Sequence, residues 1–155
     1  MRINIPFIVK ETEDGSFHPI VQAEIDGQPI FLIIDTGASR TVLDKRLVNS
    51  YTVSENINQE AFAAGINAQK LEVEQAVVPN LKIGDVVFSN LAVFCTDLKP
   101  VSALFEEISQ TPIDGLLGCD FFHSHNATIN FNEKIITIDK PKRKGLQPNQ
   151  KIIQS

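Results

Sequence analysis

Residues 31–39, which read FLIIDTGAS, decide how this sequence is interpreted. The continuously apolar run before the acid predicts a strand over 29–35 that is buried on both faces. Asp35 on its own has a plain structural explanation, because aspartate often ends a strand and begins an Asx-type turn. The loop that follows is more specific, since Gly37 permits the close approach of another chain and the small residues after it leave room above the carboxylate. A carboxylate with a chemical role is therefore one of two interpretations of Asp35.

Most of the remaining chain consists of short predicted strands joined by tight turns. Alternating apolar side chains predict strands over 3–9, 18–25, 70–78 and 88–96, and a last hairpin over 127–138. Asp-Gly dipeptides and similar turn residues separate several of these segments. Frequent short strands of this kind predict an all-β barrel or sandwich.

Few segments depart from the strand pattern. Four apolar side chains recur at helical spacing and predict a helix with one apolar face over 101–109. Residues 42–48 fit either a short helix or an extended segment, and the polar residues 51–69 predict a loop or hairpin. The four apolar residues of the predicted helix are Val101, Leu104, Phe105 and Ile108.

A second apolar segment, at 115–122, follows the first after about 80 residues and reads GLLGCDFF. Together the two segments resemble the aspartic protease family, in which two apolar residues precede Asp-Thr/Ser-Gly and a later apolar-apolar-Gly element packs beneath that loop. Residues 33–39 match the first pattern throughout, and the order of elements from 3 to 138 is similar as well. Because the chain carries one such loop and not two, it resembles the single-lobe, retroviral-type (retropepsin-like) proteases.

This resemblance implies an all-β, retropepsin-like acid-protease barrel with one short helix. It implies a single protease domain over 1–140, followed by a basic tail, 141–155, that we expect to be flexible. In such proteases the active site forms on the two-fold axis of a homodimer, with one aspartate from each subunit. The implied function is an aspartic endopeptidase that hydrolyses a peptide or protein substrate with a water held between two Asp35 carboxylates, without metal or cofactor.

The resemblance also implies roles for the rest of the active-site loop. Thr36 crosses the dimer axis and hydrogen-bonds its counterpart, Gly37 contacts the substrate backbone, and Ala38 and Ser39 complete the loop. The implied flap and substrate-binding residues are Phe62, Gly65 and Ile66, with Val42 and Leu43 as further candidate walls of the cleft.

The second segment is expected to support the loop from below. The resemblance places Leu116 and Leu117 beneath the loop, where Gly118 allows close packing. An ion pair braces this region in the family, and Arg40 with Asp120 is the candidate pair in this sequence.

Composition and charge exclude several other classes of protein. The 155 residues are 43% hydrophobic and 21% charged, which fits one globular domain. The net charge is −5, and because 140–155 carry +5, the first 139 residues carry −10, unlike the basic surface of a nucleic-acid-binding protein. No apolar stretch approaches the ~20 residues of a membrane-spanning helix. Since no signal-peptide pattern is visible, we expect a cytoplasmic protein.

The sulfur and imidazole side chains suggest no metal centre. Cys95 and Cys119 lie in apolar contexts and are expected to be buried free thiols. Asp120, His123 and His125 are close in sequence, but zinc sites more often take three or four His and Cys ligands from separate segments. No metal site is therefore predicted.

Two other functions stay open at this level. A domain of the same fold can bind an extended peptide by strand addition without cutting it, and Asp35 can be structural in an unrelated β-barrel. The intact Asp-Thr-Gly set favours catalysis, because a binding module has no physical need of a partly buried acid at this position.

Overall fold

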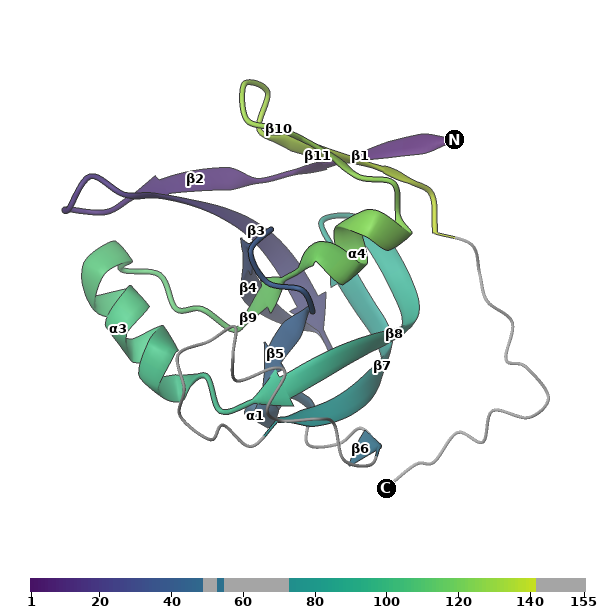
Figure 1. The fold of residues 1–155 in the computed structure, drawn as a ribbon, viewed down its shortest axis with the longest axis horizontal. Coiled ribbons are helices and arrows are strands. Elements are labelled where there is room, and N and C mark those ends of the chain that lie inside the picture. Colours follow the sequence, from purple (N-terminus) through teal and green to yellow (C-terminus); the bar gives the residue numbers. More distant parts are fainter. Residues whose placement is uncertain (49–52, 55–72, 142–155) are drawn as a thin grey trace.

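The structure is a computed structural model that describes residues 1–48, 53–54 and 73–141, and it consists mainly of β-strands (Figure 1). The strands are β1 (Arg2–Pro6), β2 (Ile8–Glu11), β3 (Phe17–Ile25), β4 (Gln28–Ile34), β5 (Val42–Asp44), β6 (Val53–Ser54), β7 (Glu74–Ile83), β8 (Val86–Thr96), β9 (Gly115–Leu117), β10 (Thr128–Asn130) and β11 (Ile135–Asp139). The helices of the described residues are α1 (Lys45–Val48), α3 (Lys99–Ser109) and α4 (Cys119–Ser124).

The strands form two sheets that share one core. The larger sheet has the order β2-β3-β4-β9-β5-β8-β7-β6, and an additional pairing of β3 with β7 closes it into a barrel. The smaller sheet, β1-β11-β10, lies across one end of the molecule, at the top of Figure 1. Its side chains Ile5, Ile136 and Ile138 are buried in the same cluster as the barrel interior. The prediction of an all-β barrel is confirmed.

The predicted turns fall where the Asp-Gly dipeptides stand. Between β3 and β4, Asp26 and Gly27 have φ angles of 51° and 79°. Two successive positive φ angles define a type I′ turn, whose twist matches that of the strands it joins. The resulting hairpin sets the register that pairs Ile20 with Ile33 and Ile25 with Gln28.

Strands β4 and β9 are parallel neighbours although they lie far apart in the sequence. Leu32, Ile33 and Ile34 pair with Gly115, Leu116 and Leu117. A side chain at Gly115 does not fit, because a Cβ atom there would lie 2.5 Å from the carbonyl oxygen of Val42. The two segments that carried the family resemblance are therefore side by side in the barrel.

The helices differ from the prediction in number and in packing. The segment 42–48, left open between two structures, forms both a strand, β5, and a helical turn, α1. Residues 119–124 form α4, which the glycine-punctuated sequence did not reveal. The predicted helix is present as α3, but of its four apolar side chains only that of Phe105 is buried. The predicted loop over 51–69 lies outside the described residues except for β6, and the predicted tail lies outside them except for Pro141.

Strand β4 is buried on one face only, which corrects the prediction. Leu32 and Ile34 point into the barrel core, at 0% and 6% exposure. Phe31 and Ile33 alternate onto the outer face and are half-buried beneath Phe105 of α3. The apolar run is continuous because a helix covers part of the outer face and not because a second sheet does.

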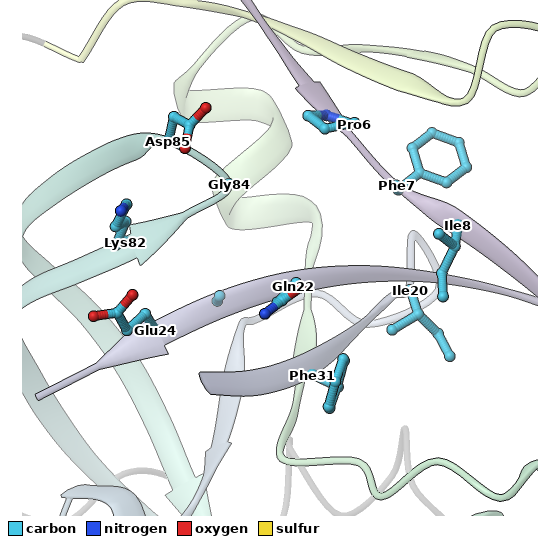
Figure 2. Close-up of a pocket in the computed structure, with 11 residues that line it drawn as sticks. Pro6, Phe7, Ile8, Ile20, Gln22, Glu24, Phe31, Lys82, Gly84 and Asp85 are labelled. Carbon is cyan, nitrogen blue, oxygen red and sulfur yellow. The ribbon is translucent and has the colours of Figure 1, made fainter. Parts of the chain in front are cut away.

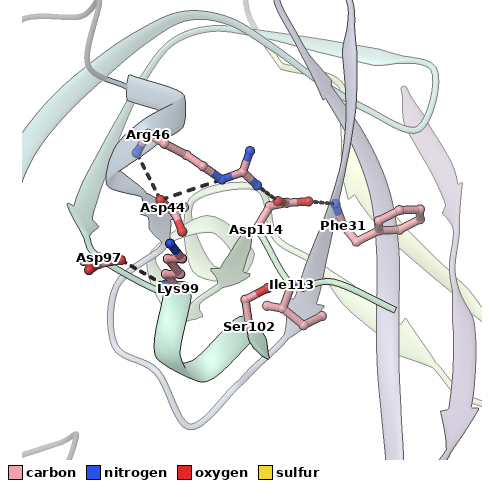
Figure 3. Close-up of polar contacts among 8 residues, drawn as sticks. All are labelled: Phe31, Asp44, Arg46, Asp97, Lys99, Ser102, Ile113 and Asp114. Carbon is pink, nitrogen blue, oxygen red and sulfur yellow. Dashed lines mark hydrogen bonds and ion pairs between the residues drawn. The ribbon is translucent and has the colours of Figure 1, made fainter. Parts of the chain in front are cut away.

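A polar cluster around two buried aspartates, Asp44 and Asp114, ties β4, β5 and the start of β9 together (Figure 3). The Asp114 carboxylate accepts a hydrogen bond from the backbone N–H of Phe31 at 2.8 Å and pairs with the Arg46 guanidinium. Asp44 accepts from the backbone N–H of Arg46 at 3.0 Å, and its own N–H donates to the carbonyl oxygen of Asp114 at 2.8 Å. Both aspartates are about 5% exposed, so these contacts replace the hydration that burial removes.

We expect replacement of Asp114 by alanine to lower the free energy of unfolding by about 2 kcal/mol, because the buried N–H of Phe31 loses its acceptor. Asp114→Asn is expected to cost less, since the amide oxygen still accepts from that N–H. Urea unfolding of both variants measures the difference. The matched control is Asp85→Asn, at an exposed aspartate in the β7–β8 turn. A loss in Asp114→Ala no larger than in this control would contradict the assigned role.

No helix of the described residues is both long and apolar enough to cross a membrane.

Candidate active site

Asp35 stands immediately after β4 and is held by three backbone contacts. Its N–H donates to the carbonyl oxygen of Leu117 at 3.0 Å, which extends the β4–β9 ladder by one residue. Its carboxylate Oδ1 accepts from the N–H of Gly37 at 3.0 Å, and its carbonyl oxygen accepts from Ala38 at 3.1 Å. The Asx-type turn that the sequence allowed is therefore present. It fixes the carboxylate through Oδ1, while Oδ2 has no hydrogen-bond partner among the described residues.

The alternation of β4 determines the direction in which this carboxylate lies. Leu32 and Ile34 face the core, so Phe31, Ile33 and Asp35 belong to the outer face. The Asp35 residue is half-buried, and Thr36 and Gly37 beside it are exposed. The carboxylate is thus rigidly held at the barrel surface, where a second molecule can reach it.

The second apolar segment lies directly against this loop. Leu117 accepts the N–H of Asp35, and the N–H of Cys119 donates to the carbonyl oxygen of Ala38 at 2.8 Å. A Cβ atom on Gly118 would lie 2.5 Å from both the carbonyl carbon and the carbonyl oxygen of Arg40. The absence of a side chain at Gly118 therefore permits this close contact.

The predicted ion pair between Arg40 and Asp120 is wrong. Asp120 Oδ1 instead accepts from both the N–H and the hydroxyl of Thr41, each at 2.8 Å. The same hydroxyl accepts from the N–H of Gly118 at 3.1 Å. Arg40 is exposed, and its guanidinium lies over the ring of Phe94, 5.6 Å from the centroid. The brace exists, but a buried threonine forms it and not the arginine.

Thr41 is the supporting residue that sequence reasoning missed. It is 1% exposed and joins three segments, since its carbonyl oxygen also accepts from the N–H of Phe94 at 2.9 Å. The available signal was a threonine in an otherwise apolar stretch, TVL at 41–43. A buried hydroxyl needs hydrogen-bond partners. Asp120, the acid of the second segment, could therefore have been paired with Thr41 from the sequence.

The two cysteines have different environments, and only one matches the prediction. Cys95 is buried, and burial together with the nearby Glu74 carboxylate raises the pKa of its thiol to about 11. Cys119 is exposed, which contradicts the prediction of a buried thiol. Its Sγ donates to the carbonyl oxygen of Thr36 at 2.8 Å, because the first turn of α4 places it beside the active-site loop.

The candidate walls of the cleft are not all available to a substrate. Val42 and Leu43 are 1% and 0% exposed, so their prediction as cleft walls is wrong: β5 carries them into the core. The other candidates, Phe62, Gly65 and Ile66, lie outside the described residues.

The described residues contain no group of three or more His, Cys, Asp or Glu side chains placed to hold a metal ion. His125 has a structural environment, since its Nδ1 lies 2.8 Å from the carbonyl oxygen of Phe121 and its ring contacts Phe88.

Two hollows lie near these elements, and neither contains Asp35. One, of about 440 Å³, lies over the outer face of β3, between apolar side chains that include Ile20 and Phe31 and polar ones that include Glu24 and Lys82 (Figure 2). The other, of about 610 Å³, lies between β8 and α4 and includes Asp120.

A family model and two solved structures are similar to this chain. A family model described as aspartyl protease matches residues 21–121, which include Asp35 and the second segment up to Phe121. No curated protein matches the chain. Among solved structures, the retroviral protease-like domain of Ddi1 from Leishmania major is similar, at 14% identity and a TM-score of 0.48, covering 79% of this chain and 88% of that one. A retropepsin-like aspartic protease from Rickettsia conorii is 15% identical, at a TM-score of 0.47, covering 89% of this chain and 88% of that one.

The described residues form a closed barrel that carries one Asp-Thr-Gly loop, which is a retropepsin-like fold. The family model covers more than half of the sequence, and the chain belongs to the aspartyl protease family.

Proposed function

We propose that this protein is an aspartic endopeptidase that acts as a homodimer, with the Asp35 carboxylates of two subunits as the catalytic pair. The observation that carries the proposal is the placement of Asp35. It is held by the turn through Gly37 on the outer face of β4, where a second copy can bring its own carboxylate close. The sequence contains one Asp-Thr-Gly loop, so one chain supplies one member of the pair.

The proposed reaction follows from placing two carboxylates together. Both cannot ionise cheaply at short distance, so the pair shares one proton. The ionised member takes a proton from a bound water as the water oxygen attacks the carbonyl carbon of the peptide. The protonated member gives its proton to the carbonyl oxygen. The amide nitrogen then takes the proton that the first carboxylate removed from water, and a hydroxyl of the tetrahedral intermediate returns a proton to the second carboxylate. The C–N bond breaks, and a carboxyl and an amino terminus leave.

The supporting residues keep the roles that the family resemblance implies. Thr36 meets its counterpart across the axis, and the exposed Gly37 backbone contacts substrate. Ala38 and Ser39 complete the loop, and the element formed by Leu116, Leu117 and Gly118 holds it from below. The flap roles belong to Phe62, Gly65 and Ile66. The Asp120–Thr41 brace adds support, because it fixes the segment that follows the loop.

The proposed dimer leaves the terminal strands paired within each chain. Residues Arg2 to Pro6 of β1 pair with Asp139 to Ile135 of β11 in the same molecule, and the Arg2 guanidinium contacts Asp139 at 2.7 Å. In retroviral-type proteases the terminal strands of the two subunits interleave. Here that exchange would first break five registered residue pairs, so we propose an interface around the exposed loop at 36–37 instead.

The dependence of cleavage on protein concentration tests the proposal. If the active site needs two chains, the rate below the dimer dissociation constant rises with the square of the concentration and becomes linear above it. A mixed peptide library across pH 4–7 serves as the substrate, with products identified by mass spectrometry. Folded protein that binds peptides and cuts none would point to the rival function, a peptide-binding module on the same fold. A rate linear at every concentration would contradict the shared site.

A further inference from the structure

Helix α3 carries an apolar stripe that the rest of the described chain does not cover. Val101, Leu104 and Ile108 are 52%, 63% and 41% exposed, although they recur on one side of the helix. The helix is docked through Phe105 and Ser109, and Ser102 accepts the N–H of Ile113 at 3.0 Å. Because these contacts lie on an adjacent side, the stripe is turned away from the barrel and faces outward.

The stripe lies beside the face of β4 from which the Asp35 carboxylate emerges. Phe105 packs with Ile20 and Ile113 against Phe31 and Ile33, which are the outward side chains of β4. Asp35 is the next outward residue after Ile33. Figure 1 shows α3 standing on this flank, next to β4 and β9. A chain that is bound at Asp35 and extends along this face therefore meets α3.

The size and charge of the stripe indicate what binds there. Three aliphatic side chains are too few for a stable interface between subunits, which buries about 800 Å² on each partner, but they match one or two apolar side chains of a bound peptide. The exposed Glu107 follows Leu104 by one turn, and the first 139 residues carry −10. An acidic neighbour of this kind disfavours acidic residues next to the apolar one and favours basic residues.

We infer that Val101, Leu104 and Ile108 form a specificity-determining wall that binds an apolar side chain of the polypeptide substrate, at a fixed distance along the substrate from the bond that is cut. This inference rests on the proposed function, and it adds the class of substrate: an extended polypeptide with an apolar residue near a neutral or basic one. The wall acts on substrate binding and not on the chemistry at Asp35.

The test compares wild type with a triple variant, V101S, L104S and I108S, in which exposed apolar side chains become small polar ones. The matched control is Ala103→Ser, at an exposed position on another side of the same helix. We expect the triple variant to raise KM about tenfold for library peptides with the apolar residue, to leave kcat unchanged, and to lose the preference at that position. The control is expected to behave as wild type.

Binding is measured in parallel, by anisotropy of the same labelled peptides with each α3 change made in the Asp35→Asn background. This measurement separates the two proposals. If wild-type protein binds the peptides and cuts none, the proposed protease function is wrong. The peptide affinities of the triple variant and the control would still test the role of α3. Equal KM and affinity in the triple variant and the control would overturn the inference. So would a weakened dimer by sedimentation with unchanged peptide affinity, because the stripe would then contact a second copy.

Discussion

Replacement of Asp35 by asparagine is expected to lower the rate of peptide cleavage at least about a thousandfold while the protein stays folded. The amide has nearly the shape of the carboxylate, and its oxygen still accepts from the N–H of Gly37, which is 3.0 Å from Oδ1 in the structure. What it loses is the ability to take a proton from water. A dimer of the variant therefore retains the cleft and lacks the base.

The experiment measures initial rates on one peptide identified from the library, with circular dichroism and thermal unfolding as controls for folding. Asp85→Asn is the matched control, because it removes an exposed acid from the turn between β7 and β8. It is expected to cut at the wild-type rate. Cleavage by folded Asp35→Asn at a rate within about tenfold of wild type would mean that the carboxylate is not the base.

Replacement of Gly118 by alanine has the second large expected effect, on stability and on activity together. The added methyl would lie 2.5 Å from the carbonyl carbon and oxygen of Arg40 and 2.9 Å from the N–H nitrogen of Thr41. These neighbours are backbone atoms, so they cannot turn aside as a side chain can. We expect a loss of about 3 kcal/mol or more in unfolding free energy, as in severe overpacking.

The same clash disturbs the active-site loop, because the N–H of Gly118 donates to the Thr41 hydroxyl and the neighbouring N–H of Cys119 donates to Ala38. Any variant that folds is therefore expected to cut slowly. Gly15→Ala is the matched control: Gly15 has a φ of 81° and no atom within 4 Å of the added Cβ, so its cost is confined to backbone strain of roughly 1–2 kcal/mol. Wild-type stability and activity in Gly118→Ala would contradict the assigned packing.

The sequence predicted those parts of the fold that depend on local pattern. The alternation over 88–96, the Asp-Gly turn at 26–27 and the helix near 101–109 are each specified by residues close together in the chain. The single strand predicted over 3–9 is wrong, because the chain breaks at Phe7 into β1 and β2, which belong to different sheets. Helix α4 was not predicted, because its six residues are too few for an apolar repeat at helical spacing to be recognised. Gly118 directly follows β9 and is the N-cap residue of α4.

The active-site loop and the segment beneath it were predictable from the sequence, whereas the residues that brace the loop and line the cleft were not. The Asp-Thr-Gly loop and the segment at 115–118 are short motifs, and they lie together because β4 and β9 pair in parallel. The partner of Asp120 was wrongly predicted, because the charge of Arg40 suggested an ion pair. Asp120 instead accepts a hydrogen bond from Thr41, which is buried. The burial of Val42 and Leu43 and the exposure of Leu104 follow from tertiary packing, which periodicity does not specify.

The most direct test of the shared site is a subunit-mixing experiment. Wild-type protein at a fixed concentration is equilibrated with increasing amounts of Asp35→Asn, and cleavage of one peptide is followed. If each active site takes one Asp35 from each of two chains, mixed dimers are inactive, and a threefold excess of the variant lowers activity to about a quarter when the chains are fully dimeric and pair at random. Activity that stays at the wild-type level at every ratio, while exchange of labelled subunits proves that mixed dimers form, would contradict the proposed catalytic pair.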